Sequence, residues 1–198
     1  MARTKNFDED KVLEAAMLLF WEKGYSATSM KELEQVMQLN PTSIYNTFGS
    51  KRELFQKALR LYMNSALSGF IDAITNARSL PIALQNVLNE VIRLHYNPGH
   101  PGGCMVMLSI LENEQHDEET RAMLNSALPL LRDTLVKRFK QAQAAGEIST
   151  EMDSKDFGNH VTALISGMIT MAKSGFSKNE LKHLIQSSSD CLLQQCGI

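Results

Sequence analysis

Cysteine, proline and glycine are all scarce in this chain. Its 198 residues include 3 cysteines, 5 prolines and 11 glycines. An odd number of cysteines, with no close pair of the kind that binds metal, argues against a disulfide framework and indicates a reduced, cytoplasmic protein. Few helix-breaking residues, short β-branched runs and 11 methionines together favour an all-helical fold.

Long apolar runs and catalytic motifs are also lacking. The longest apolar-rich stretch, residues 161–172, is interrupted by Thr162, Ser166 and Thr170 and is too short to cross a bilayer. The first residues lack the apolar segment of a signal peptide. The chain has no Glu-x-x-His pair, no nucleophile motif and no glycine-rich phosphate loop. We therefore expect no membrane association, no enzyme and no cofactor.

Charge is nearly balanced but unevenly placed. The net charge is −2, and residues 1–60 hold nine Lys/Arg against eight Asp/Glu (+1), which leaves eleven against fourteen (−3) for the rest. The early acids lie mostly in the first predicted helix, whereas Lys31, Lys51 and Arg52 flank a polar helix. Contact with phosphates depends on the cations within reach of them, so a near-neutral module can still bind DNA.

The segment 28–54 predicts two short helices joined by a tight turn, followed by the start of a third. Asn40-Pro41 is a strong helix start, and Ser50 with Glu53 forms a capping box that begins a long fourth helix. The first helix is expected between Asp8 and Gly24. Later helices are predicted at residues 81–95, 103–113, 118–145, 153–174 and 178–196. The prediction is an all-α fold of about nine helices, with a helix-turn-helix DNA-binding domain at 1–52 and a helical ligand-binding and dimerisation domain at 53–198.

A family resemblance accompanies this pattern. The motifs Lys23-Gly24-Tyr25-x-Ala27-Thr28-Ser29-Met30 and Tyr45-x-x-Phe48-Gly49-Ser50-Lys51-x-x-Leu54 resemble the N-terminal DNA-binding domain of TetR-family transcriptional regulators. Two positions depart from the family pattern: Gln38 stands where the turn usually has glycine, and Glu34 where helix two usually has a small residue. The resemblance implies a homodimeric repressor that binds a pseudo-palindromic operator in double-stranded DNA and is released by a small-molecule inducer.

The resemblance also implies which residues contact DNA. The recognition helix would run from Pro41 to Thr47. Short polar side chains suit base edges, and asparagine suits adenine best. The expected base contacts are Thr42, Ser43 and Asn46; the expected phosphate contacts are Thr28, Tyr45 and Lys51; Lys31 could reach either, and Arg3 and Lys5 could follow the backbone. Tyr45 as a packing residue and Ser43 as a merely solvated one are the alternatives.

Dimerisation is expected through the last two helices, because one helix-turn-helix covers only a few base pairs. These two helices carry more apolar residues than packing against the core of one monomer requires. The predicted interface is Val161, Leu164, Ile165, Met168, Leu181, Leu184, Ile185 and Leu192. The alternative is that both helices pack only on their own core.

An inducer pocket is expected among the middle helices, as in the family. Methionine and phenylalanine suit adaptable cavities for a partly apolar ligand. The candidate lining residues are Met63, Phe70, Leu94, Met105, Leu108, Leu111, Met123 and Met168, each of which could instead be ordinary core. A shift of the fourth helix would then change the separation of the two recognition helices.

Cys104 is a candidate redox sensor. It follows Gly102-Gly103 at a predicted helix start, where free amides lower a thiol pKa. A Gly-Cys pair here also occurs in some family members, including ones that respond to electrophiles or oxidants, so a thiol-based regulator is one alternative function. The other interpretation of Cys104 is a small buried residue.

A metal site is not expected, because His95, His100 and His116 lack compact metal-ligand spacing with Cys104. A helical-bundle enzyme and a protein-interaction module remain the competing classes.

Overall fold

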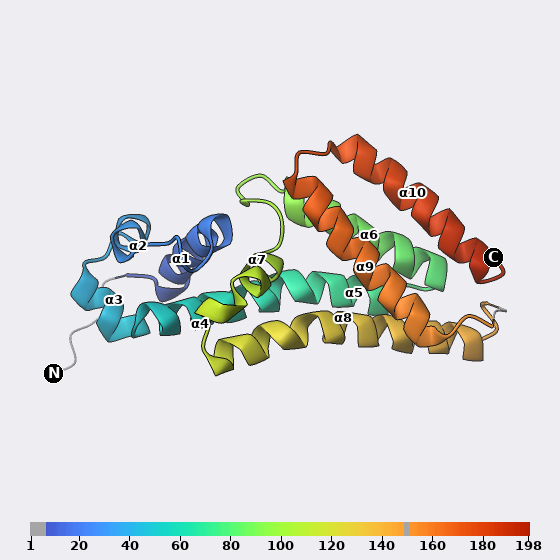
Figure 1. Ribbon diagram of the computed structural model, residues 1–198, viewed down its shortest axis with the longest axis horizontal. Coiled ribbons are helices and arrows are strands. Elements are labelled where there is room, and N and C mark those ends of the chain that lie inside the picture. Colours follow the sequence, from blue (N-terminus) through green and yellow to red (C-terminus); the bar gives the residue numbers. More distant parts are fainter. Residues whose placement is uncertain (1–6, 149–150) are drawn as a thin grey trace.

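The computed structural model describes residues 7–148 and 151–198, and within these ranges it contains helices and no strand (Figure 1). The α-helices are α1 (Glu9–Lys23), α2 (Met30–Met37), α3 (Pro41–Phe48), α4 (Lys51–Tyr62), α5 (Ser68–Thr75), α6 (Leu80–Tyr96), α7 (Met105–Leu111), α8 (Glu118–Ala144), α9 (Ser154–Lys173) and α10 (Lys178–Gln195). A π-helical segment, η1 (Met63–Leu67), joins α4 to α5, and a short 3-10 turn, η2 (Asn113–Gln115), follows α7. Because α4, η1 and α5 form one continuous helix, the all-α fold of about nine helices is confirmed.

The helix starts near the N-terminus follow the predicted capping residues. Asp8 caps α1, and Ser50 caps α4 in a reciprocal capping box with Glu53. Asn40 caps α3, with Pro41 as its first residue. Each cap satisfies backbone amides that the helix leaves unpaired, which is why the sequence marks these boundaries so clearly.

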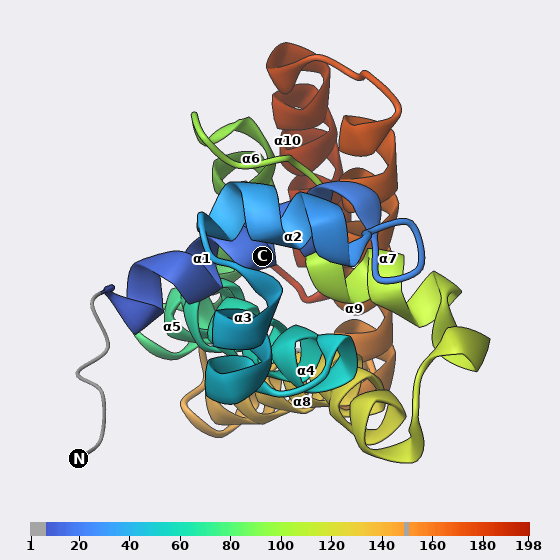
Figure 2. The ribbon, with the colours of Figure 1, turned by 90° about the vertical axis from the view of Figure 1, so that its left-hand side faces the viewer.

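The first three helices and the first half of α4 pack together at one end of the molecule. Phe20, Leu33 and Ile44 are fully buried between them, and the ring of Phe20 meets the edge of Phe55 at 5.1 Å between centroids. Figure 2 shows α2 and α3 nearest the viewer at this end, with α9 and α10 behind them. The apolar side of α3 is thereby fixed while its opposite side faces outward.

The remaining helices form a bundle at the other end. The long α8 runs beside α9, and α10 packs against α6 (Figure 1). Gly158 permits the close approach of α8 and α9, because a Cβ atom there would lie 2.7 Å from Val136 Cγ2. None of the helices in the described ranges is long and apolar enough to cross a membrane.

One helix connects the two ends. Leu54 and Phe55 of α4 are buried at the α1–α3 end, and Phe70 and Ile74 of α5 are buried in the bundle. The predicted domain boundary at residues 52 and 53 falls inside the first turn of α4. That boundary stays a prediction, because the connecting helix belongs to both groups of helices.

Candidate DNA-binding surface and effector cavity

The outward side of α3 is polar and accessible. Tyr45 is 51% exposed, and Pro41, Thr42 and Asn46 are also exposed, with Thr47 half-buried beside them. Ile44 and Phe48 are buried beneath them, as predicted, and hold the helix against α1, α2 and α4. The surface around Asn46 is therefore not covered by the rest of the described chain.

Two lysines border this surface. Lys31 is exposed in the first turn of α2, and Lys51 lies at the first position of α4. The Nζ atom of Lys51 sits 4.5 Å from the centre of the Tyr25 ring, a cation–π contact. Burial lowers the pKa of Lys51, and the carboxylates of Glu112 and Glu32 oppose that shift. A cation at a helix N-terminus is unfavourable on its own, so these neighbours help to keep it there.

The turn between α2 and α3 has the geometry that the family pattern requires. Gln38 has φ 52° and ψ 38°, and it is the only non-glycine residue with positive φ among those described. A side chain in this left-handed conformation costs on the order of 1 kcal/mol, which is tolerable. Glutamine at the usual glycine position therefore adopts the left-handed conformation of this turn.

The structure corrects the role of Thr28. Its side chain is fully buried, and its hydroxyl donates to the carbonyl oxygen of Gly24 at 2.6 Å. The cap of α2 is Ser29, which accepts a hydrogen bond from the amide of Glu32. The Thr28 side chain thus closes the turn before α2 and is not exposed to a phosphate. The capping box takes the amides of Ser29 and Glu32, which leaves those of Met30 and Lys31 as candidates.

Ser43 is half-buried, and its amide donates to the side chain of Asn40 at 2.9 Å. Its hydroxyl remains a candidate for a base contact. The other early candidates, Arg3 and Lys5, lie outside the described residues. Among the described residues, no group of three or more His, Cys, Asp and Glu side chains is arranged to hold a metal.

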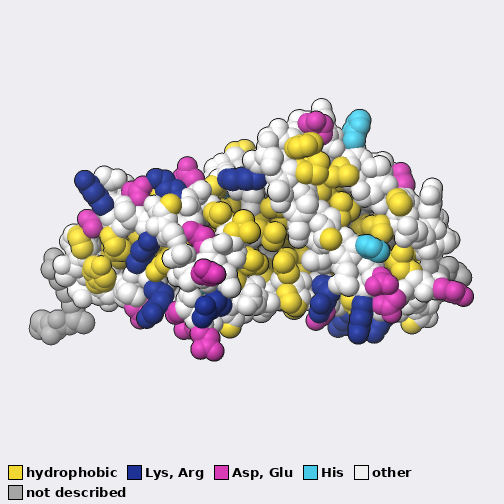
Figure 3. All heavy atoms as spheres, in the orientation of Figure 1, with side chains coloured by type: hydrophobic (Ala, Val, Ile, Leu, Met, Phe, Trp, Pro, Cys, Tyr) yellow, Lys and Arg dark blue, Asp and Glu magenta, His cyan; other side chains and the backbone are white. Residues whose placement is uncertain are grey.

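A small apolar cavity lies where the π-helical segment passes α7, α8 and α9. Its volume is about 50 Å³, and its wall is entirely apolar in surface. Figure 3 shows the molecule in the orientation of Figure 1. Apolar side chains gather in the middle of the visible face, over the region where α7 and α9 approach α5. The lining residues are Tyr62, Ala66, Leu67, Phe70, Cys104, Val106, Met107, Ala127, Leu128, Leu131, Ile165 and Ile169.

Most of the predicted lining residues lie elsewhere. Phe70 alone of the eight is in the cavity wall. Leu94, Met105 and Met168 are buried in other parts of the core; Met63, Leu108 and Met123 are half-buried; Leu111 is 85% exposed. Apolar periodicity predicts which side of a helix is buried, but it does not predict which buried residues border a void. No sequence pattern marks η1, whose wider turn brings Ala66 and Leu67 to the cavity.

Cys104 lines this cavity as the N-cap of α7. The expectation of an acidic thiol is wrong: burial raises the pKa of Cys104, and the Tyr62 hydroxyl and the amides of Met107 and Val106 only partly oppose the shift. Burial likewise raises the pKa of the Tyr62 hydroxyl, which forms no hydrogen bond of standard geometry among the described residues. The cavity wall therefore includes a neutral thiol beside the buried Tyr62 hydroxyl.

The predicted dimer residues mostly face inward. Val161, Ile165, Met168, Leu181, Ile185 and Leu192 are at most 9% exposed within the single chain, which favours the alternative that they pack on their own core, and Leu164 and Leu184 are half-buried. The outer surface of α9 and α10 carries a shallow groove with both polar and apolar side chains. It is lined by His160, Leu164, Ser187, Ser188, Cys191, Leu192 and Gln195.

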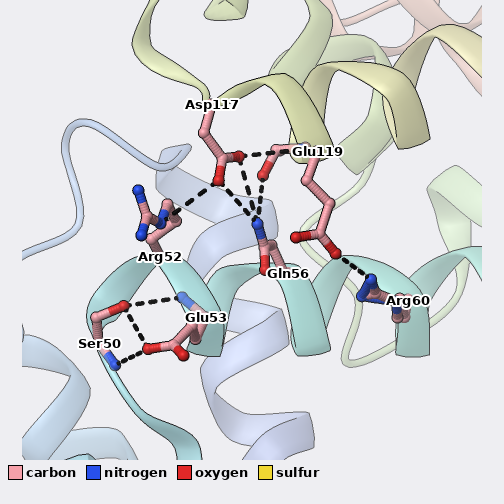
Figure 4. A network of polar contacts seen from close by, with 8 residues as sticks. Ser50, Arg52, Glu53, Gln56, Arg60, Asp117 and Glu119 are labelled. Atoms are coloured by element: carbon pink, nitrogen blue, oxygen red, sulfur yellow. Dashed lines mark hydrogen bonds and ion pairs between the residues drawn. The ribbon is translucent and has the colours of Figure 1, made fainter.

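A polar network ties α4 to the start of α8. The Gln56 side-chain amide donates to Asp117 at 3.1 Å and to Thr120 at 3.2 Å, and Arg52 pairs with Asp117 at 3.4 Å (Figure 4). One turn further on, Arg60 pairs with Glu119 at 2.7 Å. Asp117 thus caps α8 and contacts α4, and Glu119 is the ion-pair partner of Arg60.

Comparison with known proteins agrees with this geometry. The sequence profile described as bacterial regulatory proteins of the tetR family matches residues 12–58, and a profile described as the C-terminal domain of tetracyclin repressor-like proteins matches residues 82–187. The HTH-type transcriptional repressor BdcR of Escherichia coli is 29% identical over 184 residues, covering 90% of this chain and 86% of that protein. The repressor ComR of the same organism is 27% identical over 183 residues, covering 92% and 87%.

A solved structure extends the comparison to a DNA complex. A cysteine-substituted form of the TetR-family regulator CifR, bound to 26-base-pair operator DNA, superposes with a TM-score of 0.86. It is 26% identical, and the match covers 96% of this chain and 98% of that one. The reduced form of Escherichia coli NemR, at 14% identity and a TM-score of 0.77, shares the fold.

Lys51→Ala should weaken binding to every DNA sequence and flatten the dependence of affinity on salt. One phosphate contact per chain contributes roughly 0.9 to the slope of log affinity against log salt, or about 2 for a dimer. Fluorescence anisotropy between low and moderate salt measures this slope. Lys140→Ala, at the far end of α8, is the matched control and should leave it unchanged. An unchanged slope in Lys51→Ala would refute the phosphate contact.

Proposed function

Because the chain belongs to the TetR family of transcriptional regulators, we propose that it is a repressor released from its operator by a small apolar inducer. The observation that carries the proposal is the exposed polar side of α3, with Tyr45 and Asn46 accessible and Ile44 buried beneath. Such a helix matches the recognition element of helix-turn-helix proteins. We place its action in the cytoplasm, on double-stranded operator DNA.

Each accessible side chain has a role that fits its chemistry. Thr42, Ser43 and Asn46 are assigned to base edges, where asparagine pairs with adenine through two hydrogen bonds. Tyr45, Lys31 and Lys51 are assigned to phosphates, which position the helix without reading sequence. Thr28 is withdrawn from this set as a side-chain contact, because its hydroxyl is already bonded within the turn.

A homodimer is proposed through the outer surface of α9 and α10. Exposed Ala163 and Gly167 follow one another at helical spacing on α9, and a Cβ atom at Gly167 would meet nothing within 4 Å. Small residues let two helices approach closely, and a two-fold axis here would present two copies of α3 to a pseudo-palindrome. A stable interface needs roughly 800 Å² from each partner, which two helices of this length can supply.

The apolar cavity is the proposed inducer site. Its wall includes Tyr62, Ala66 and Phe70, which belong to the continuous helix that begins at Lys51 beside the DNA-binding surface. A ligand that fits only one position of this helix shifts the population toward that position by its differential affinity. An apolar wall around a small void selects a compact, apolar molecule.

The thiol-based alternative has one observation in its favour, which is that Cys104 lines the same cavity. A soft electrophile such as an activated alkene would meet the sulfur there. The thiol would add across the double bond, with sulfur bonding to one carbon and the proton passing to the other. The raised pKa makes this reaction slow at neutral pH, so reversible occupancy is the preferred mechanism.

Ala127→Leu should block the cavity while leaving DNA binding intact. Ala127 is 4% exposed on α8, and the larger side chain fills space that a ligand would take. Xenon serves as the probe, because dry apolar cavities bind it and a single atom suits a void of about 50 Å³. We expect xenon under pressure to weaken binding of the wild type to the upstream region of the protein's own gene, measured by fluorescence anisotropy, and to have no effect on Ala127→Leu. Equal sensitivity of both proteins would remove the cavity from the mechanism.

Gly167→Arg should produce monomers that bind the operator poorly. The new side chain has room within the protomer but would place two like charges at the proposed two-fold axis. Sedimentation velocity at micromolar concentration checks the mass. Gln143→Arg, on the exposed side of α8, adds the same charge outside the groove and should remain dimeric. A dimeric Gly167→Arg protein would place the interface elsewhere.

The thiol alternative is tested in a Cys191→Ser background, since Cys191 is exposed whereas Cys104 is half-buried and Cys196 buried. If Cys104 is a sensor, N-ethylmaleimide lowers operator affinity in this protein, and a further Cys104→Ser substitution abolishes the response. Complete alkylation of Cys104 with unchanged affinity rejects the alternative.

A further inference from the structure

The turn between α1 and α2 is held by a carboxylate from outside the DNA-binding helices. The backbone amides of Tyr25 and Ser26 donate to Glu112 Oε2 and Oε1, at 2.8 and 3.1 Å. Glu112 is the residue that ends α7, and 86 to 87 positions of sequence separate it from the turn. Two amides that would otherwise require solvent thus share one carboxylate, and hydrogen bonds to an ionised acceptor are among the stronger ones in proteins.

The turn is shaped to accept this side chain. Gly24 has φ 84°, a conformation that favours glycine, and a Cβ atom there would lie 2.8 Å from Glu112 Oε2. Any other residue at this position would displace the carboxylate. On the other side, the Thr28 hydroxyl fixes the Gly24 carbonyl at 2.6 Å. The five residues from Gly24 to Thr28 are therefore fixed from both sides, by a buried threonine and by Glu112.

This turn positions two parts of the proposed DNA-binding surface. Ser29, the cap of α2, follows it directly, so the turn sets where the free amides and Lys31 face. The ring of Tyr25, within the turn, carries the Lys51 ammonium group. The Glu112 charge also acts on Lys51, since it opposes the lowering of the Lys51 pKa by burial. One carboxylate thus influences both a phosphate-facing helix start and a phosphate-facing cation.

We propose that Glu112 is a positioning residue for operator recognition. It fixes the α1–α2 turn, and with it Lys51 and the start of α2, in the arrangement that an operator phosphate backbone requires. Its negative charge near this surface also repels DNA of any sequence. Glu112 therefore raises the ratio of operator affinity to non-operator affinity through both effects. The proposal rests on the proposed DNA-binding surface.

Two substitutions separate position from charge. Glu112→Ala removes both hydrogen bonds, whereas Glu112→Gln removes the same charge but keeps one oxygen that accepts an amide. Glu114→Gln, on the exposed turn η2, removes the same charge two residues away and is the matched control. Circular dichroism melting confirms that each variant is folded at the temperature of the binding assay.

The assay measures affinity for an operator that the wild-type protein selects from a random pool, and for a scrambled duplex of the same composition. Operator affinity should fall about tenfold in Glu112→Ala and less in Glu112→Gln, since the second keeps one bond. Affinity for the scrambled duplex should be unchanged or higher in both variants, because both keep the Lys51 charge and non-specific binding depends on that charge more than on its exact position. Glu114→Gln should lose no operator affinity. Equal losses on both duplexes, or no loss on the operator, would overturn the proposal.

A double-mutant cycle with Lys51→Ala adds a measurement that a purely structural role would not affect. If Glu112 positions Lys51, removing Lys51 costs less operator affinity in the Glu112→Ala protein than in the wild type, by about threefold. Additive losses in variants that remain folded contradict the positioning role. The Lys51→Ala arm alone reports on the proposed DNA-binding surface, so failure of that surface is distinguished from failure of the Glu112 proposal.

Discussion

The continuous helix from Lys51 to Thr75 is the constraint on which the rest of the structure depends. Its first turns are buried against α1 and α3, and its last turns are buried in the bundle, so neither end can tilt without disturbing a packed core. The π-helical segment η1 lies between them and forms part of the cavity wall. Such segments occur often at functional sites because they add a residue without ending the helix. A molecule in the cavity would therefore act on an element whose first turns are packed among the DNA-binding helices.

Local features of this chain could be predicted because their causes are local. The caps Asp8, Asn40 and Ser50, and the left-handed turn at Gln38, each depend on a few neighbouring residues. The exposure of Asn46 followed in the same way, because an apolar stripe of Ile44 and Phe48 determines which side of a short helix is buried. The fold class and the recognition helix were accessible from sequence for this reason.

The features that sequence could not give depend on contacts between distant residues. Threonine is a residue type that often caps helices, yet the Thr28 hydroxyl donates to the carbonyl oxygen of Gly24, and Ser29 is the cap of α2. Glu112 lies in an acidic stretch of sequence that carries no sign of this contact, and only the folded chain brings it to Tyr25 and Ser26. The richly apolar sides of α9 and α10 indicated a partner, but α6 and α8 bury them within the chain. Hydrophobic pattern identifies a buried surface without identifying what covers it.

The acidic residues near the DNA-binding surface also explain how a chain of net charge −2 can bind a polyanion. Glu53 accepts a hydrogen bond from the amide of Ser50, and Glu112 accepts hydrogen bonds from two amides of the α1–α2 turn. The negative charge of both carboxylates is therefore partly compensated by nearby backbone dipoles. A hydrogen bond with Lys23, together with those from Ser29, lowers the pKa of Glu32 to about 2 and keeps this carboxylate ionised at a helix start, where negative charge is favourable. Lys31 and Lys51 remain beside the recognition helix, and neither forms an ion pair with an acid of residues 7–148 or 151–198. DNA affinity here depends on which charges are compensated within the protein, and the net sum says little about it.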